Sequence, residues 1–110
     1  MKHLIAALLI SALAGAAVAQ PTAQGYAIAS VRCSACHALD DVHSSPNPGA
    51  PTFAQIGLRW PGRTLAYRIA FATRNGHYAM PPRSLTVAER GAVAAYIRET
   101  ADRVERARGN

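Results

Sequence analysis

The stretch Cys33-Ser-Ala-Cys36-His37 carries the strongest chemical signal in this chain of 110 residues. Two thiols separated by two residues can add to the two vinyl groups on one side of a porphyrin. The histidine that follows can then direct its imidazole at the iron. A C-x-x-C-H pattern is typical of covalent haem attachment. We therefore predict one haem c held by thioethers from Cys33 and Cys36, with His37 as its first axial ligand.

Three other interpretations of the two cysteines compete with haem attachment. A thioredoxin-like redox pair needs a βαβ context, and no segment of this chain alternates like a strand. A closed zinc site needs four ligands, and although His43 and His77 are available there is no second cysteine pair. A plain structural disulfide would leave the position of His37 unexplained.

The second axial ligand is expected from the segment Ala79-Met80-Pro81-Pro82. Met80 is the single methionine after the first residue, and it lies between residues that favour a stiff, extended loop rather than on an apolar helical stripe. A thioether held in this way can ligate the iron, and His/Met ligation raises the reduction potential. His77, three residues earlier, is the competing ligand, although a histidine in such a loop is more often solvated. His43 is expected at the surface.

The first 19 residues have the pattern of a secretory signal peptide. Lys2 is followed by an uncharged run rich in Leu, Ile and Ala, and Ala17-Val18-Ala19 is a small-x-small cleavage site. The run is shorter than a typical membrane span, so a retained anchor is the less favoured alternative. We expect cleavage before Gln20, a single domain over residues 20–110, a periplasmic location and no permanent membrane span.

The remaining 91 residues are basic. Removal of residues 1–19 takes away the single lysine and leaves eleven arginines against six acidic residues, a net charge of +5. A basic exported protein is expected to bind an acidic protein partner. The sequence has no arginine cluster interleaved with aromatic residues, so nucleic acid is not expected as a partner. A domain of this size buries only a small apolar core, which gives it little stability. A bulky covalent cofactor would add much of the buried apolar surface that the chain itself lacks.

The periodicity of apolar residues and the capping residues predict three helices. The predicted fold is therefore all-α, with long loops between the helices. The last helix begins at a capping box, Thr86-Val-Ala-Glu89, and is expected to fray among Arg103, Arg106 and Arg108. The segment between residues 38 and 60 is rich in turn formers and is predicted to be a loop. The predicted helices run from about 22 to 35, from 61 to 74, with Pro61 at the first helical position, and from 86 onward.

Together these features resemble a class I cytochrome c over nearly all of residues 22–101. Gly25 lies eight residues before Cys33 and matches the family's helix-crossing glycine. Val93-x-x-Tyr96-Ile97 resembles the apolar-x-x-Tyr-Leu pattern of the last helix. The family's usual aromatic four residues before the first cysteine is replaced by Ala29, and Ile28 or Tyr26 is expected to fill its space. Gly91 is expected to mark a second tight crossing.

The resemblance also implies roles for four further residues. Gly49-Ala-Pro51-Thr-Phe53 is similar to the family's Gly-Pro loop, whose proline carbonyl accepts a hydrogen bond from the haem histidine. Tyr67 is similar to a tyrosine near the methionine sulfur. Trp60 and Arg59 resemble groups that bind a haem propionate.

The resemblance implies a small electron carrier whose iron cycles between Fe(III) and Fe(II). We also expect a monomer, and the basic charge predicts an acidic redox protein as its partner. The six acidic residues form no motif that suggests catalysis, so an enzyme is not expected. Two alternatives remain open. One is a haem protein whose methionine bond opens to bind or reduce a small ligand, as in a peroxidase or a gas sensor. The other is an electron-entry subunit of a dehydrogenase.

Overall fold

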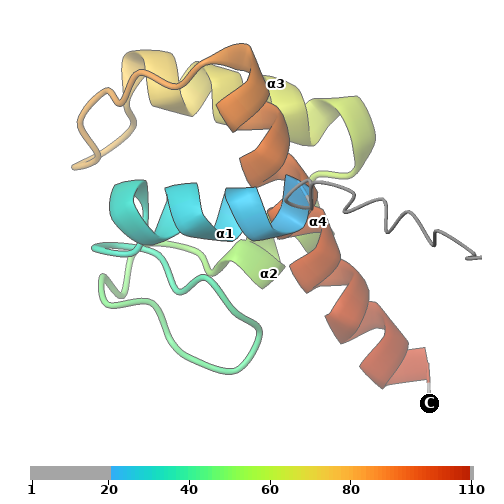
Figure 1. Ribbon diagram of the computed structural model, residues 1–110. Helices are drawn as coiled ribbons and strands as arrows, with labels where there is room; N and C mark the ends of the chain where they lie inside the picture. Colours follow the sequence, from blue (N-terminus) through green and yellow to red (C-terminus); the bar gives the residue numbers. More distant parts are fainter. Residues whose placement is uncertain (1–20, 110) are drawn as a thin grey trace, which may run out of the picture.

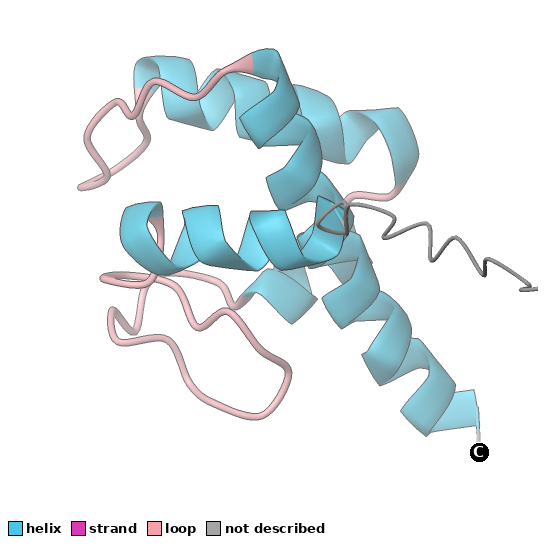
Figure 2. Ribbon diagram, in the orientation of Figure 1, coloured by secondary structure: helices cyan, strands magenta, loops and turns pink. Residues whose placement is uncertain are grey.

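The computed structural model of the protein describes residues 21–109, and the predicted signal segment 1–19 lies outside these residues. The described chain is all-helical and contains no strand, which confirms the predicted all-α class (Figures 1 and 2). It has four helices where the sequence predicted three. They are α1 (Pro21–Arg32), α2 (Phe53–Arg59), α3 (Gly62–Asn75) and α4 (Val87–Gly109).

The additional helix, α2, lies inside the segment that the sequence analysis predicted to be loop. A capping box begins it: the backbone N–H of Gln55 donates to Thr52 Oγ1 (3.1 Å), and the Thr52 N–H donates to Gln55 Oε1 (2.9 Å). Turn formers occupy the chain only up to Pro51, and the seven residues that follow are too few to show a clear helical period. The prediction of one continuous loop was therefore wrong.

The boundaries of the other helices also differ from the prediction. Helix α1 ends at Arg32 rather than near Ala35, because residues 33–37, the predicted haem-attachment segment (called the attachment segment below), form a turn instead of continuing the helix. Pro61 is the N-cap of α3, with extended backbone angles, rather than its first helical residue. The last helix does not fray among its terminal arginines but continues to Gly109.

The capping box predicted at the start of α4 is present. The Thr86 N–H donates to Glu89 Oε2 (2.7 Å), and the Glu89 N–H donates to Thr86 Oγ1 (3.1 Å). These two bonds satisfy backbone donors that a helix N-terminus leaves without partners.

Helix α4 is the surface against which the other three helices pack. Two glycines allow the closest approaches. A Cβ atom at Gly25 of α1 would lie 2.0 Å from the carbonyl oxygen of Ala92, and one at Gly57 of α2 would lie 2.7 Å from Ala101 Cβ. The expected crossing at Gly25 is thus confirmed. The core around these crossings consists of Ala29, Phe53, Leu65, Ile69, Leu85, Val93, Tyr96 and Ile97.

Ala29 is fully buried and belongs to the same core as the aromatic residues Phe53 and Tyr96. The ring of Tyr26 meets that of Tyr96 edge-on, with centroids 5.4 Å apart, and the ring of Phe53 lies 6.2 Å from that of Tyr96 on another side. Ile28 packs against the same core. Tyr26 is half-exposed, and the replacement of the family's missing aromatic by Ile28 or Tyr26 stays a prediction.

Gly91 does not mark a crossing, so that prediction was wrong. The residue is exposed, and a Cβ atom built there would meet no other atom within 4 Å. The helical period places Gly91 on the solvent side of α4, and the neighbouring Ala92 makes the close contact instead.

The two glycines form a matched pair for a stability test. Gly25→Ala should lower the free energy of unfolding by about 1–3 kcal/mol, because the methyl group would overlap a backbone carbonyl that cannot rotate away. Gly91→Ala should raise it by up to about 1 kcal/mol, because alanine favours a helix interior and no neighbour interferes. Denaturant unfolding of the haem-loaded variants measures both. Equal effects of the two substitutions would contradict the proposed crossing.

Candidate functional site

The attachment segment forms a turn at the end of α1. The N–H of Cys33 still donates to Ala29 O (2.8 Å), and the N–H groups of Cys36 and His37 both donate to Cys33 O (3.2 and 3.0 Å). Both cysteines are free thiols and partly buried, which does not support the structural-disulfide alternative. Two nucleophilic sulfurs and one imidazole are therefore carried by a single turn.

A hydrogen bond fixes the tautomer of His37. Its Nδ1 lies 2.7 Å from the carbonyl oxygen of Pro51, and its side chain is buried, with the residue 8% exposed. A carbonyl oxygen can only accept, so Nδ1 carries the proton and Nε2 keeps the lone pair that a metal ion requires. The predicted hydrogen bond from His37 to Pro51 is thus confirmed.

The loop that presents Pro51 is held by bonds to the attachment segment itself. The Phe53 N–H donates to Ala38 O (2.9 Å), and the Asn47 N–H donates to Cys36 O (3.2 Å). From α4, the hydroxyl of Tyr96 donates to Leu39 O (2.7 Å). The ring of Phe53 also lies 5.9 Å from that of His37, a contact that the sequence analysis missed. The aromatic residue directly after the capping Thr52 was the available signal.

The second predicted ligand lies on a tight turn between α3 and α4. His77 and Met80 form an antiparallel bridge: the His77 N–H donates to Met80 O (3.2 Å), and the Met80 N–H donates to His77 O (2.8 Å). The Arg83 N–H closes the base of this loop on Thr73 O (2.7 Å). Gly76, at φ 71°, begins the turn, and a Cβ atom there would lie 2.5 Å from Met80 O.

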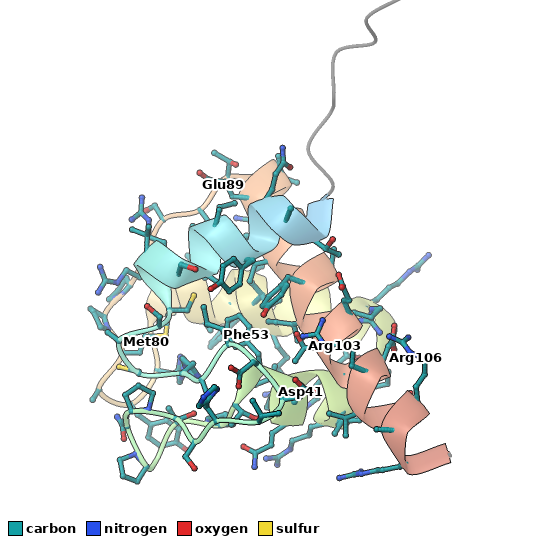
Figure 3. The ribbon with its side chains drawn as sticks, turned by 60° about the horizontal axis from the view of Figure 1, so that its bottom comes forward. Asp41, Phe53, Met80, Glu89, Arg103 and Arg106 are labelled. Atoms are coloured by element: carbon teal, nitrogen blue, oxygen red, sulfur yellow. The ribbon has the colours of Figure 1, made fainter. Side chains whose placement is uncertain are left out.

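The turn with Met80 and the attachment segment lie at the same end of the molecule. In Figure 1 the C-terminal end of α1 and the loop before α4 both lie on the left, whereas the end of α4 projects on the opposite side. Figure 3 likewise shows Met80 and Arg106 at opposite ends. The fold therefore brings Cys33, Cys36 and His37 to the same end as Met80.

His77 lies closer to the site than the sequence indicated. Its ring centroid is 6.3 Å from that of His37, and its Nδ1 is buried without a hydrogen-bond partner. Burial, followed by the charge of His37, lowers the pKa of His77. The residue as a whole is partly buried rather than fully solvated. His43 is exposed as expected and pairs with Asp40 at 2.5 Å.

Burial and two nearby arginines have opposite effects on the pKa of Cys33. Burial raises the pKa of the Cys33 thiol, while the charges of Arg83 and Arg32 lower it. Arg32 ends α1, and Arg83 follows the turn with Met80, so the fold draws positive charge from two distant segments to the attachment site.

The three remaining residues implied by the resemblance have other contacts in the structure. The guanidinium groups of Arg59 and Arg68 lie 4.9 and 4.8 Å from the ring centroid of Trp60, which is partly buried against the core. Tyr67 is exposed, and its ring lies 6.3 Å from that of Phe71. Their predicted contacts with a haem stay predictions.

The donor set fits a covalently bound haem. It offers two free thiols on one turn, one imidazole with a free Nε2, and a thioether at the same end of the molecule. The Nδ1 atom of His77 is buried and has no hydrogen-bond partner, so a polar atom near His37 lacks the interaction that buried polar atoms normally make. Within residues 21–109, no three His, Cys, Asp or Glu side chains gather as a metal site, and none of the helices has the length and apolarity of a membrane span.

Comparison with known proteins gives one family. Residues 20–97 match the family described as cytochrome C oxidase, cbb3-type, subunit III. No curated protein and no solved structure matches the chain. The match covers most of the chain and includes the attachment turn, all of α1, α2 and α3, and the first half of α4. The chain therefore belongs to the cbb3-type cytochrome c oxidase subunit III family, a family of c-type cytochromes.

Proposed function

We propose that the protein is an exported electron carrier that holds one haem c through Cys33 and Cys36, with His37 and Met80 as axial ligands. The bound haem supplies a one-electron couple between Fe(III) and Fe(II). The observation that carries the proposal is the His37–Pro51 hydrogen bond of 2.7 Å beside two free thiols, because it prepares one imidazole nitrogen for iron. Membership of a c-type cytochrome family supports the same chemistry.

Each residue has a distinct task in this proposal. The two thioethers hold the cofactor permanently, so the carrier does not lose it on each encounter. His37 is oriented by Pro51 and packed beside Phe53, which restricts rotation of its ring. Met80 favours ferrous iron and so raises the reduction potential. With both axial positions filled by the chain, electron transfer rather than ligand binding follows.

The location and extent of the domain belong to the same proposal. Residues 1–19 direct export and are removed, residues 20–110 form the haem domain, and the protein functions in the periplasm as a monomer. The pattern of Lys2, an apolar run and Ala17-Val18-Ala19 supports export.

The distribution of charge supports an acidic redox partner. No acidic residue occurs between Val42 and Ala88. Among the described residues, the ion pairs made by arginine belong to Arg103, which pairs with Glu99 (3.3 Å) and Asp41 (4.0 Å). The cationic residues of the acid-free stretch are Arg59, Arg63, Arg68, Arg74 and Arg83.

The family description also favours a second candidate function. It names a subunit of an oxidase, so a chain of this family can serve as an electron-entry subunit rather than as a free shuttle. The cationic end around Arg32 and Arg83 would meet the partner in both cases.

Loss of both thiols should abolish covalent attachment. Cys33→Ala/Cys36→Ala should yield protein that releases all haem on acid-acetone extraction, because no thioether can form, whereas the wild type should retain its haem. A matched control is Ser34→Ala, which leaves both thiols in place. A double variant that still matures with covalent haem would show that the attachment assignment is wrong.

Loss of the thioether should remove the sulfur-to-iron band of the oxidised protein. Wild-type protein should show this weak near-infrared band, and Met80→Ala should lack it and gain carbon monoxide binding in the reduced state. Absorption spectra with and without carbon monoxide measure both effects. A wild type that binds carbon monoxide fully at neutral pH would favour the ligand-binding alternative, and retention of the band in Met80→Ala would refute the assignment.

Docking should depend on the cationic end of the molecule. In stopped-flow reduction with an acidic redox protein, the second-order rate should fall as salt rises, because screening shortens the reach of the field. Arg74→Glu or Arg83→Glu should slow the reaction more than Arg106→Glu, since Arg106 lies at the opposite end from Met80 (Figure 3). A flat salt dependence, or equal effects of the three reversals, would exclude this docking face.

A further inference from the structure

Two side chains that can ligate iron lie on one face of the turn between α3 and α4. His77 and Met80 are directly opposed in an antiparallel bridge and exchange two backbone hydrogen bonds. Directly opposed residues in such a pair project their side chains to the same face, with Cβ atoms about 5 Å apart. The imidazole and the thioether are therefore offered to the same side of the turn.

The imidazole of His77 lies near that of the proposed iron ligand His37, and the two rings are tilted by 43°. Two imidazoles that share one first-row metal ion at about 2.0 Å per bond place their ring centroids about 6 Å apart. The observed separation between the rings of His37 and His77 is 6.3 Å. Nδ1 of His77 is buried and has no hydrogen-bond partner, so a nitrogen of this ring lacks the interaction that a buried polar atom normally has.

The residue between the two candidate ligands has an unusual backbone conformation. Tyr78 lies in the left-handed region at φ 47°, which is unfavourable for a bulky residue. Its side chain is fully exposed and makes a ring contact with His77 at 6.2 Å.

We propose that His77 is a reserve axial ligand, which takes the sixth position on the haem iron when Met80 leaves it. The inference rests on the proposed function, because it requires a haem held by Cys33, Cys36 and His37. In the exchange an iron–sulfur bond breaks and an iron–nitrogen bond forms. The neutral imidazole donates its lone pair, and no electron or proton is transferred.

The composition of the chain leaves few other side chains that could bind the iron in place of Met80. Residues 20–110 contain no lysine and three histidines: His37, His43 and His77. His37 is the first axial ligand in the proposal, and His43 is exposed on another loop, where it pairs with Asp40.

The test uses the full haem-loaded chain in the ferric state with Met80→Ala as the starting variant. This variant should remain low-spin, and near-infrared magnetic circular dichroism should show nitrogen ligands on both sides of the iron. Adding His43→Ala should change nothing. Adding His77→Ala, or His77→Phe to preserve packing against His37, should convert the iron to a high-spin or water-ligated form.

Titration with free imidazole supplies a second readout. If His77 occupies the sixth position about nine-tenths of the time, Met80→Ala should bind imidazole about tenfold more weakly than Met80→Ala/His77→Phe, because only the open fraction is competent. Met80→Ala/His43→Ala should match Met80→Ala.

A high-spin or water-ligated Met80→Ala variant that binds imidazole as tightly as Met80→Ala/His77→Phe would overturn the inference. It would leave the proposed function intact, provided that the wild type retains covalent haem and its sulfur band. Absence of covalent haem from the wild type would refute the proposed function itself, so the two failures are distinguishable.

Discussion

The hydrogen bond from His37 Nδ1 to the Pro51 carbonyl is the constraint on which the rest of the site depends. It joins two segments that are 14 residues apart and determines which imidazole nitrogen remains available. The bond can form only because Pro51 is held in place on both sides. Before it, the Asn47 N–H binds Cys36 O, and after it the capping box of Thr52 begins α2. The histidine, the loop and the short helix therefore form one unit.

Helix α4 provides the rigid support for this unit. Gly25 and Gly57 bring α1 and α2 so close to α4 that a methyl group would overlap backbone or side-chain atoms. The hydroxyl of Tyr96 then ties α4 to Leu39, directly beyond the attachment segment. Close packing on the α4 side leaves the opposite ends of α1 and α3 to face the site, where loops rather than helices carry the chemical groups (Figure 1).

Charge is unevenly distributed along the chain. Acidic residues occur at Asp40 and Asp41 and along α4, where Glu99 pairs with Arg103, whereas the stretch from Val42 to Ala88 carries five arginines and no acidic residue. An electron carrier must meet its partner quickly and leave quickly. The positive charges of Arg32 and Arg83 near Cys33 would speed the encounter without requiring a large apolar interface.

The sequence by itself determined the all-α class and the capping box at Thr86, because both are written in residues that act within a few positions of one another. The crossing at Gly25, which depends on a contact with Ala92 of another helix, was predicted from the family resemblance instead. Two features that the prediction missed were also local: the capping box of Thr52 and Gln55 begins α2, and the helical period places Gly91 on the solvent side of α4. The tertiary structure alone decided that the ring of His77 lies 6.3 Å from that of His37 and that α4 is the surface against which the other helices pack. The physical reason is that contacts between residues far apart in the chain depend on how helices cross, and no local pattern of side chains records that geometry.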